Sequence, residues 1–405
     1  MTFERSVALK RIQPSATIAI TQIGRDLRAA GRDIISLSIG EPDFDTPEHI
    51  KAAASEAMAR GETKYPPVGG IPQLKAAIAE KFRRENSLEF SNAEVTVSGG
   101  AKQVIANALM ATLNPGDEVI IPAPYYVSYP QLTNLFGGAP VFVETTEASG
   151  YKLQPEALER AINPNTKWLL LNSPGNPTGT AYSLSDLAAL AEVLRRHPHV
   201  YILSDDIYEH LIYDDIAFAT MANTAPDLMD RILTVNGVSK AYAMTGWRIG
   251  YGAGPTPLIK AMELVQSQMT SGASTIMQWG AVAALTGPQD MLIERRANFD
   301  QRRRRVVAAL NEIDGIECRM PDGAFYAYPS CAAYIGATSA GGRKIDTDEA
   351  FSSALLQEHG VATVHGTAFG AGPNFRVSYA ASIGQLDEAC SRIAAFCADM
   401  RQPQI

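Results

Sequence analysis

Short apolar runs alternate with helix-like segments through the middle of this 405-residue chain, from about residue 93 to about residue 285. Each apolar run ends in glycine, proline or polar residues, and a segment with helical periodicity follows it. Parallel strands need a crossover between them, so this alternation predicts a doubly wound, mostly parallel sheet with helices on both faces. The predicted fold class is therefore α/β. The expected strands span residues 94–97, 118–121, 168–171, 200–203 and 232–235, with a glycine-rich run at 249–254.

The pattern changes after about residue 287. A long arginine-rich helix is expected at 291–313, and the shorter elements after it predict a smaller α/β unit. We therefore predict three parts: an N-terminal arm that joins the smaller domain (1–46), a larger domain (47–287) and the rest of the smaller domain (288–405). In the arm and the smaller domain, strands are expected at 34–37, 317–319, 324–329, 362–364 and 375–378, and helices at 21–30, 348–359 and 386–400.

The charge and composition of the chain argue against several classes of protein. There are 35 Lys and Arg against 43 Asp and Glu, a net charge of −8, which predicts that neither nucleic acid nor an anionic membrane is the partner. The basic cluster at 302–305 lies in the expected long helix, and we interpret it as a solvated helix face rather than a binding patch. We find no signal-peptide core and no membrane-spanning apolar run, so we expect a cytoplasmic protein. The 4 cysteines and 6 histidines lack metal-ligand spacing, which predicts free thiols and no metal site.

Two cations, Lys240 and Arg248, stand in apolar surroundings between the runs at 232–235 and 249–254. Most lysines are solvated surface charges, and that is the alternative interpretation here. The small and apolar flanks favour a desolvated lysine, whose charged form is disfavoured and whose amine becomes a usable nucleophile. An arginine a little further along suits a phosphate group, because its planar fork pairs with phosphate oxygens.

The segment Ser-Lys-Ala-Tyr-Ala-Met-Thr-Gly-Trp-Arg-Ile-Gly-Tyr at 239–251 resembles the cofactor-lysine segment of class I aminotransferases. These are pyridoxal phosphate (PLP) enzymes of the aspartate aminotransferase family, and the resemblance is to the bacterial aspartate and aspartate/prephenate subgroup. It extends from about Pro14 to Tyr379. It implies a PLP-dependent transferase of fold type I, a larger domain with a mostly parallel seven-stranded sheet between helices, and a smaller α/β domain from both chain ends. It also implies a homodimer with shared active sites, in which Lys240 binds PLP covalently and moves the proton at the substrate's Cα.

Residues 98–102, Ser-Gly-Gly-Ala-Lys, follow an expected strand and open a helix expected at 103–113. The free N–H groups at a helix N-terminus offer an anion site, although a simple helix cap is the alternative. The resemblance implies that this N-terminus holds the PLP phosphate with Arg248 opposite. It also implies that Tyr65, in the loop 63–70, contacts the phosphate of the other subunit. The backbone contacts to the phosphate would come from Gly100, Ala101 and Lys102.

The resemblance also assigns the residues around the cofactor ring. Tyr126 lies in an aromatic cluster that would usually be core, but it matches the position whose ring stacks on the pyridine. Asn176 opens an Asn-Pro-Thr-Gly turn and would donate to the ring oxygen. Two aspartates follow the strand at 200–203, where α/β sheets place ligands. Asp205 would be the partner of the pyridinium nitrogen and Tyr208 a second donor to the ring oxygen, whereas we interpret Asp206 as structural.

Gly40 and Arg376 are the candidates for binding the substrate's α-carboxylate. Gly40 lies in a turn after a strand, where a glycine permits close approach to a ligand. Arg376 stands in an alternating strand, and an arginine that points inward needs an anion because it cannot lose its charge. The resemblance implies that both residues contact the α-carboxylate, with Tyr126 and Asn176 also lying against the substrate.

The identity of the substrate depends on a second cation, which a dicarboxylate needs. The subgroup often has a lysine just before the Pro-Ser-Ala-Thr motif, but this chain has Gln13 there, with Lys10 and Arg11 close by and Thr17 retained. We predict transfer of the amino group from L-aspartate to 2-oxoglutarate, giving oxaloacetate and L-glutamate. The alternative within the family is a broad-specificity or aromatic/prephenate aminotransferase.

Enzymes and regulators of other classes share part of this pattern. A PLP lyase or an aminocyclopropane-carboxylate synthase would share every cofactor residue, and would form its product without an oxo acid. A PLP-sensing regulator would carry a fused DNA-binding domain, but only about 46 residues precede the expected larger domain. Nicotinamide and nucleotide enzymes are disfavoured, because neither G-x-G-x-x-G nor G-x-x-x-x-G-K-[ST] occurs.

Overall fold

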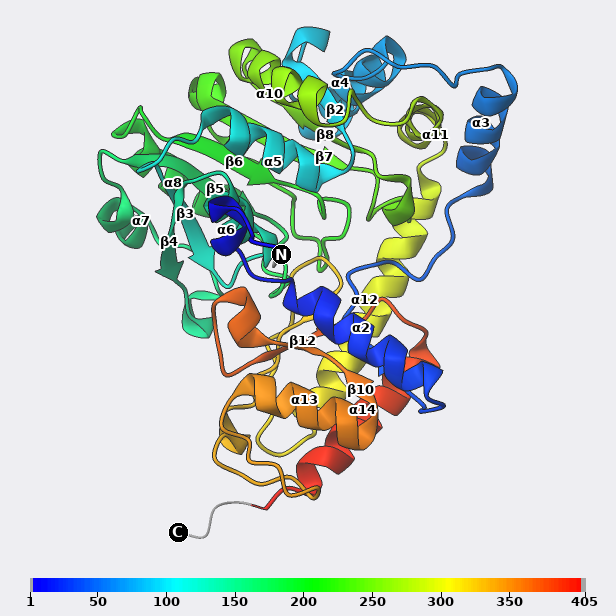
Figure 1. Cartoon of the computed structure of the whole chain (residues 1–405), viewed down its shortest axis with the longest axis vertical. Coiled ribbons are helices and arrows are strands. Elements are labelled where there is room, and N and C mark those ends of the chain that lie inside the picture. Colours follow the sequence, from blue (N-terminus) through cyan, green and yellow to red (C-terminus); the bar gives the residue numbers. More distant parts are fainter. Residues whose placement is uncertain (1–2, 402–405) are drawn as a thin grey trace.

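A seven-stranded sheet is the largest element of the computed structural model, which describes residues 3–401 (Figure 1). Its strands are β2 (Val95–Ser98), β3 (Glu118–Ala123), β4 (Ala139–Glu144), β5 (Thr166–Asn172), β6 (Tyr201–Asp205), β7 (Ile232–Gly237) and β8 (Gly250–Ala253). The strand order is β2-β8-β7-β6-β5-β3-β4. The strands are parallel except β8, which runs antiparallel to both of its neighbours. This sheet confirms the predicted α/β fold with a mostly parallel seven-stranded sheet.

The edge strand β4 is missing from the sequence prediction. It pairs with β3 on one side only, beginning at Glu118 and Ala139. Edge strands tolerate proline, and β4 carries Pro140 and leaves the Phe142 side chain 48% exposed. The run at 139–143 is apolar but only partly buried, and its internal proline argues against a strand when the sequence is read alone.

Alternate side chains of the central strands point to opposite faces of the sheet and build two separate cores. Ile120, Leu169 and Ile202 belong to the core on one face, and Leu170 and Leu203 belong to the core on the other. The central strands are therefore buried on both faces, as their apolar runs predict. The first face is covered by α3 (Glu48–Ala59), α4 (Pro72–Asn86), α8 (Leu184–Arg195) and α11 (Thr275–Thr286), and the second by α5 (Ala101–Thr112) and α10 (Thr256–Met269).

A second, smaller body lies below the sheet in Figure 1 and takes elements from both ends of the chain. It contains α2 (Ala16–Ala29), β1 (Ile35–Ser36), β9 (Tyr326–Ala327), α13 (Asp348–His359), β10 (Val361–Ala362), β11 (Val364–His365), β12 (Phe375–Ser378) and α14 (Ile383–Ala398). The parallel pair β1 and β10 holds the N-terminal segment to the C-terminal one, and β11, β12 and β9 form an antiparallel sheet. The helix α12 (Asp290–Asn311) runs from the larger body into the smaller one. The domain boundaries at 46/47 and 287/288 remain a prediction.

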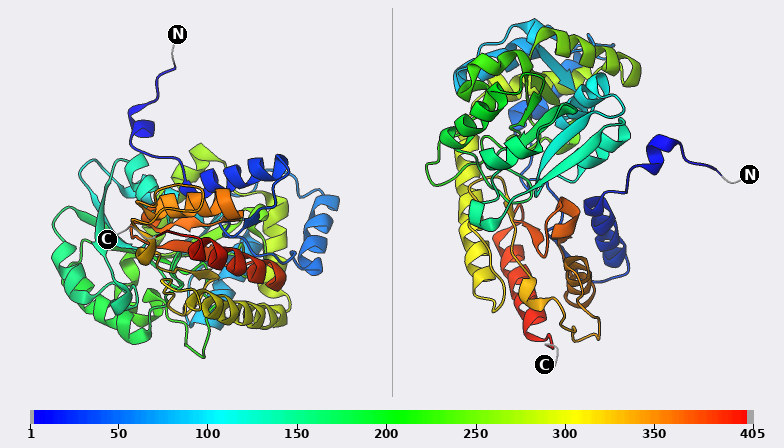
Figure 2. Two further views of the ribbon diagram at one scale, coloured as in Figure 1. Left: turned by 90° about the horizontal axis from the view of Figure 1, so that it is seen from below. Right: turned by 90° about the vertical axis from the view of Figure 1, so that its left-hand side faces the viewer.

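The part of the N-terminal arm that precedes α2, from residue 3 to residue 14, extends away from both bodies. Figure 2 shows the short helix α1 (Val7–Lys10) standing out from the rest of the chain. The backbone N–H of Gln13 donates to the Oε1 atom of Gln131 at 2.8 Å, which holds the base of the arm against the larger body. Among residues 3–401, no helix is both long enough and apolar enough to cross a membrane.

Some expected elements have different bounds in the structure. The first long helix starts at Ala16 rather than near residue 21, so it includes the second half of the Pro-Ser-Ala-Thr motif. The strand expected at 317–319 is reduced to one bridge, because the side chain of Asn311 bonds both the N–H and the C=O of Cys318. The strand expected at 324–329 is reduced to Tyr326–Ala327, since Ala324 has a φ of 56°, outside the β region.

The prediction that residues 302–305 form a solvated face is wrong for half of the run. Arg302 and Arg303 are buried, whereas the two arginines after them are exposed. Arg302 donates to Asp43 Oδ1 at 2.6 Å, and Arg303 pairs with Asp214 at 2.8 Å. Four consecutive arginines on a helix are spread around its axis, so some of them must face the protein interior. Carboxylates there compensate the charges of the buried arginines.

Replacing Arg303 by methionine should lower the free energy of unfolding by about 2 kcal/mol, because Asp214 and the Pro321 carbonyl lose the guanidinium that donates to them. Urea denaturation followed by circular dichroism measures this. The matched control is Arg305→Met, which removes an exposed pair with Asp387 and should leave the urea midpoint unchanged. Equal losses in the two variants would contradict the buried role of Arg303.

Candidate active site

One cavity of about 290 Å³ opens at the carboxyl ends of the parallel strands, between the larger and the smaller body. This is where α/β sheets place ligands, because strand ends, helix N-termini and loops meet there. All sequence-predicted site residues except Gly100 and Tyr65 line it. The lining residues among them are Gly40, Ala101, Lys102, Tyr126, Asn176, Asp205, Tyr208, Lys240, Arg248 and Arg376.

Lys240 lies in the turn after β7 and reaches into this cavity. Its Nζ atom donates to the Gly40 carbonyl oxygen at 2.6 Å. Burial, together with the positive charge of Arg376, lowers the pKa of Lys240 from 10.5 to about 8. A much larger share of the amine is therefore neutral at neutral pH than in an exposed lysine, as the apolar flanks predict.

Asp205 is the last residue of β6, and its carboxylate is buried beside the cavity. Tyr129 donates to Oδ2 at 2.7 Å, and the N–H of Ile207 lies 3.4 Å from Oδ1. Burial raises the pKa of Asp205 to about 6, although the bond from Tyr129 and the charge of Lys240 act in the opposite direction. This carboxylate is costly to ionise in its buried position, and a cationic ligand group beside it would remove that cost.

Arg376 stands on β12 of the smaller body, 2% exposed, with its guanidinium facing the cavity. Its Nη1 atom donates to Asn176 Oδ1 at 2.9 Å and its Nη2 atom to the Ser38 carbonyl at 2.5 Å. The Nε atom is buried and finds no partner among residues 3–401. A buried arginine with an unused N–H can bind an anion there, and a carboxylate matches its planar geometry.

Gly100 is the N-cap of α5 and lies directly beside Arg248, although it does not line the cavity. Its φ of +95° favours glycine, and a Cβ atom there would lie 2.3 Å from Arg248 Nη2. Arg248 donates to the carbonyl oxygens of Thr245 at 3.0 Å and Gly99 at 3.1 Å. The guanidinium is thus held over the positive end of the α5 dipole, an arrangement that can bind a phosphate.

Tyrosines line the cavity between these charged groups. The hydroxyl oxygens of Tyr208 and Tyr326 are 2.8 Å apart. The rings of Tyr126 and Tyr129 meet edge to face, with centroids 5.5 Å apart. The ammonium of Lys102 lies 5.5 Å from the centroid of Tyr126. Aromatic rings and phenol hydroxyls so placed can hold a flat, polar ring.

Sequence reasoning missed several residues of the site. Tyr129 looks like core in the sequence, and only the fold brings its hydroxyl to Asp205. Tyr326 lies in a short apolar run with no polar neighbour to mark it. The other lining residues that received no role are Ser15, Ile18, Ile105, Val127, Asn172, Ile207, Ser239 and Thr245.

Some residues considered from the sequence lie outside the cavity. Among the lining residues that the structure describes, Thr17 is present but Lys10, Arg11 and Gln13 are not. Tyr65 is 90% exposed in the single chain. The neighbouring acid, Asp206, accepts a hydrogen bond from Ser204 at 2.8 Å and does not line the cavity.

A lysine amine, a buried carboxylate and an arginine meet in one cavity at the strand ends of a doubly wound sheet, an arrangement suited to an enzyme active site. Residues 32–393 match the family described as "Aminotransferase class I and II". The chain belongs to this family and is therefore an aminotransferase, which confirms the resemblance read from residues 239–251.

Individual relatives are more specific. An "Aspartate/prephenate aminotransferase" of Cereibacter sphaeroides is 60% identical over 98% of this chain and 99% of its own length. An "Aspartate aminotransferase" of Rhizobium meliloti is 53% identical over 98% of this chain and 99% of its own length. These relatives confirm the bacterial subgroup that the sequence indicates.

Solved structures agree over nearly the whole chain. The aspartate aminotransferase from Rhizobium meliloti superposes with a TM-score of 0.96 at 52% identity, covering 99% of this chain and 100% of that one. The Thermus thermophilus aspartate aminotransferase with maleate superposes with a TM-score of 0.91 at 42% identity, covering 98% of this chain and 100% of that one.

Asp205→Asn should stabilise the cofactor-free chain by about 3 kcal/mol at pH 7, and by almost nothing at pH 4. The fold raises the pKa of the wild-type carboxyl and so favours its protonated form; the stability that this form contributes is complete below pH 3.8 and is lost as the pH rises through about 6. Urea denaturation at the two pH values measures the difference. The exposed substitution Asp346→Asn is the control, and a gain from Asp205→Asn that is equal at both pH values would contradict the burial argument.

Proposed function

We propose that this aminotransferase moves the amino group of L-aspartate to 2-oxoglutarate, giving oxaloacetate and L-glutamate, with PLP as its cofactor. The observation that carries the proposal is the single cavity that combines Lys240, whose pKa is lowered to about 8, with the buried Asp205 and Arg376. The names of the relatives from Cereibacter sphaeroides and Rhizobium meliloti support aspartate as a substrate.

The residues present fit PLP in charge and shape. Arg248 and the N-terminus of α5 would hold the phosphate, and the glycine at position 100 leaves the room that the Arg248 guanidinium needs. Lys240 would attach the cofactor covalently, and Asp205 would hold the proton on its ring nitrogen. Tyr126 would stack on the ring, while Asn176 and Tyr208 would donate to the ring oxygen.

The chemistry divides between cofactor and chain. When bound, PLP supplies an electron sink for the electron pair left at the substrate's Cα. The freed Nζ atom of Lys240 would take the Cα proton and later return it. Lowering the pKa of Lys240 from 10.5 to about 8 raises the neutral fraction of this amine at pH 7 by about 300-fold. Arg376 would fix the α-carboxylate so that the breaking bond stands across the ring.

The second carboxylate of the substrate needs a cation of its own. The lysines and arginines that line the cavity, within the described part of the chain, are Lys102, Lys240, Arg248 and Arg376. Three of these have roles toward the cofactor or the α-carboxylate, so the side chain of Lys102 is the one left for the distal carboxylate. The maleate named with the Thermus thermophilus enzyme is also a dicarboxylate, and this supports a pocket for two carboxylates.

The name of the relative from Cereibacter sphaeroides also supports prephenate as a second acceptor. Half-reactions of the cofactor-loaded enzyme, followed by the cofactor's absorbance, should rank aspartate and glutamate first among amino donors. The amine form should then react with 2-oxoglutarate, oxaloacetate or prephenate. Faster reaction with aromatic amino acids than with aspartate would replace the aspartate proposal by the aromatic one, and product formed without any oxo acid would mark a lyase.

We also propose a homodimer in which Tyr65 contacts the phosphate in the other subunit. Its nearly complete exposure in the single chain leaves its aromatic ring free for such a contact, and the exposed Phe3 and Val7 give the N-terminal arm an apolar surface to bury. A cytoplasmic location is part of the proposal, and the four buried, free cysteines support a reducing compartment.

Lys240→Ala should lower kcat by at least about 1,000-fold, because the chain then has no base at Cα and no covalent attachment point. Borohydride treatment and peptide mapping should label Lys240 in the wild type and leave the variant unlabelled. The exposed Lys260→Ala is the control and should match the wild type. A label on any other lysine of the wild type would overturn the assignment.

Lys102→Met should raise KM for aspartate by about tenfold or more, the value of one charge-assisted bond, and should leave the half-reaction with alanine almost unchanged. The backbone N–H of residue 102 stays in place, so cofactor retention should not fall. Lys10→Met, which removes an exposed cation outside the cavity, serves as the control. Equal effects on aspartate and alanine would rule out Lys102 as the distal cation.

A further inference from the structure

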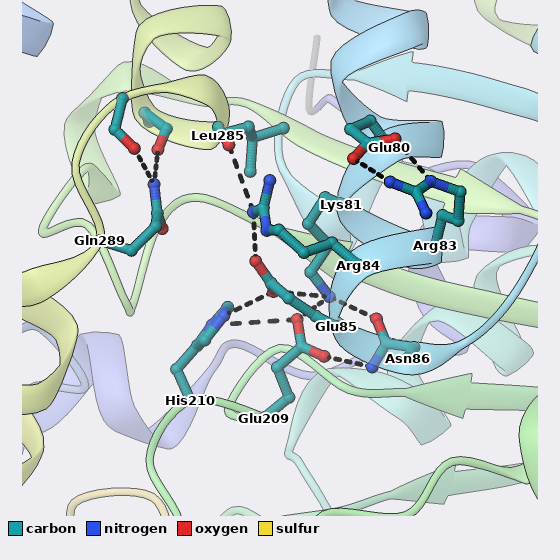
Figure 3. A network of polar contacts seen from close by, with 12 residues as sticks. Glu80, Lys81, Arg83, Arg84, Glu85, Asn86, Glu209, His210, Leu285 and Gln289 are labelled. Atoms are coloured by element: carbon teal, nitrogen blue, oxygen red, sulfur yellow. Dashed lines mark hydrogen bonds and ion pairs between the residues drawn. The ribbon is translucent and has the colours of Figure 1, made fainter.

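A second group of charged side chains lies between the end of α4 and the segments that follow β6 and β7 (Figure 3); Lys81 and Glu209 in it are buried, whereas His210 is partly buried and Glu85 is exposed. Figure 3 shows the ammonium of Lys81 pointing toward the carboxylates of Glu85 and Glu209. None of these three residues lines the cavity within the described part of the chain. We name the group the Lys81 cluster; it consists of Lys81, Glu85, Asn86, Glu209, His210 and Asn236.

Glu209 is the centre of this cluster, and both of its carboxylate oxygens have partners. Oε1 contacts the ammonium of Lys81 and accepts a hydrogen bond from Asn236 Nδ2 at 2.7 Å. Oε2 accepts a hydrogen bond from Asn86 Nδ2 at 2.9 Å. One carboxylate therefore ties together α4, the loop after β6 and the end of β7.

Lys81 is fully buried, and its ammonium has polar partners of its own. Besides the contact with Glu209, it donates to Asn86 Oδ1 at 2.8 Å and lies 3.6 Å from Glu85 Oε2. The ligand atoms of Glu85, Glu209 and His210 all lie within 4.8 Å of one another, a spacing that could suit a metal ion. Lys81 already contacts both carboxylates, so the cation of this cluster belongs to the chain itself.

The cluster is joined directly to the segments that bear the site residues. Glu209 immediately follows Tyr208, and the N–H of Glu209 donates to the carbonyl of Asp206 at 3.0 Å. On the other side, Asn236 Oδ1 accepts from the N–H of Gly237 at 2.7 Å, at the point where β7 ends and the turn toward Lys240 begins. A displacement of Glu209 must therefore move one of these two segments relative to the other.

Stability alone does not account for a buried ion pair at this point. Removing two charges from water costs about as much as their attraction returns, and apolar residues of equal size would often stabilise a protein as well. Burial would raise the pKa of Glu209, yet the charges of Lys81 and His210 hold this pKa below its usual value. The carboxylate of Glu209 is thus kept ionised, and its hydrogen bonds have a fixed direction, which apolar packing lacks.

We propose that Lys81 and Glu209 are positioning residues: their buried ion pair fixes the Glu209 carboxylate, which through Asn236 holds the loop after β6 against the end of β7 and so fixes Asp205 and Tyr208 relative to Lys240. This inference rests on the proposed function, because it assigns these three residues to the cofactor. It extends that function to groups that touch neither cofactor nor substrate.

Three variants of the cofactor-loaded enzyme test the proposal: Lys81→Met, Glu209→Gln and the double variant with both changes. Each single change leaves a buried group unpaired and should lower both the urea midpoint and kcat, the latter by about 100-fold, with KM for aspartate changed by less than about threefold. In the double variant both charges are gone, so the urea midpoint should return close to the wild-type value. Its kcat should stay low.

A readout without turnover separates positioning from a general loss of structure. The visible absorbance of the bound cofactor, titrated with pH in the absence of substrate, reports the surroundings of Lys240 and Asp205. Its midpoint should be displaced in the double variant although the urea midpoint has recovered. Wild-type stability, kcat and titration midpoint together in the double variant would show that the pair is only structural and would overturn the proposal.

Asn236→Ala provides a second route that leaves both charges in place. It removes the 2.7 Å bond between Glu209 and β7, so kcat should fall by about tenfold and the titration midpoint should move in the same direction as in the double variant. An unchanged kcat and midpoint in this variant would also overturn the proposal. This test remains decisive if the double variant does not fold.

The matched control is the ion pair of Glu80 and Arg83 on the same helix, which Figure 3 shows on the side away from Glu209. Both side chains are exposed, and Glu80→Gln together with Arg83→Met should match the wild type in every readout.

Wild-type enzyme that transfers no amino group to any oxo acid would refute the proposed function. The absorbance titration would still test the positioning role, because it requires only bound cofactor.

Discussion

Burial of charge is the constraint on which the site depends. Lys240 has a pKa of about 8 and Asp205 a pKa of about 6, because the cavity between the two bodies excludes most of the water that would solvate them. Arg376 is buried with an N–H group that finds no partner among the described residues. Each of these groups would be stabilised by a ligand group of opposite charge, so the same burial that makes their charges costly favours binding.

The sheet determines where these charges meet. Parallel strands end at the same edge, so Asn172 at the end of β5, Asp205 at the end of β6 and the turn after β7 become neighbours. The smaller body closes the cavity from the other side with Arg376 and Tyr326. Family membership and the proposed PLP chemistry therefore rest on one arrangement, in which residues far apart in the sequence surround a single cavity.

The central strands and the edge strand β2 could be predicted from the sequence, and the edge strand β4 could not. Strands β5 to β7 are buried on both faces and so appear as apolar runs without proline, whereas the apolar run of β4, which has one unpaired edge, is interrupted by Pro140. The clearest difference between prediction and structure concerns residues 302–305, where the sequence predicts a solvated helix face. Two of the four arginines are instead buried against carboxylates from distant segments. Charge in a helix does not reveal on its own which neighbours the helix will meet.

Local sequence determined which residue types the site would contain. A lysine and an arginine stand between apolar runs, which predicts desolvation, and a glycine before a helix predicts an anion site. An aspartate after a strand predicts a ligand-binding carboxylate. Only the tertiary structure decided the contacts that tune them. Tyr129 donates to Asp205 and Glu209 binds Lys81, and both pairs join segments that lie far apart along the chain. Such pairings follow from how helices pack on the sheet, and neither periodicity nor spacing in the sequence encodes the distance between two side chains brought together in this way.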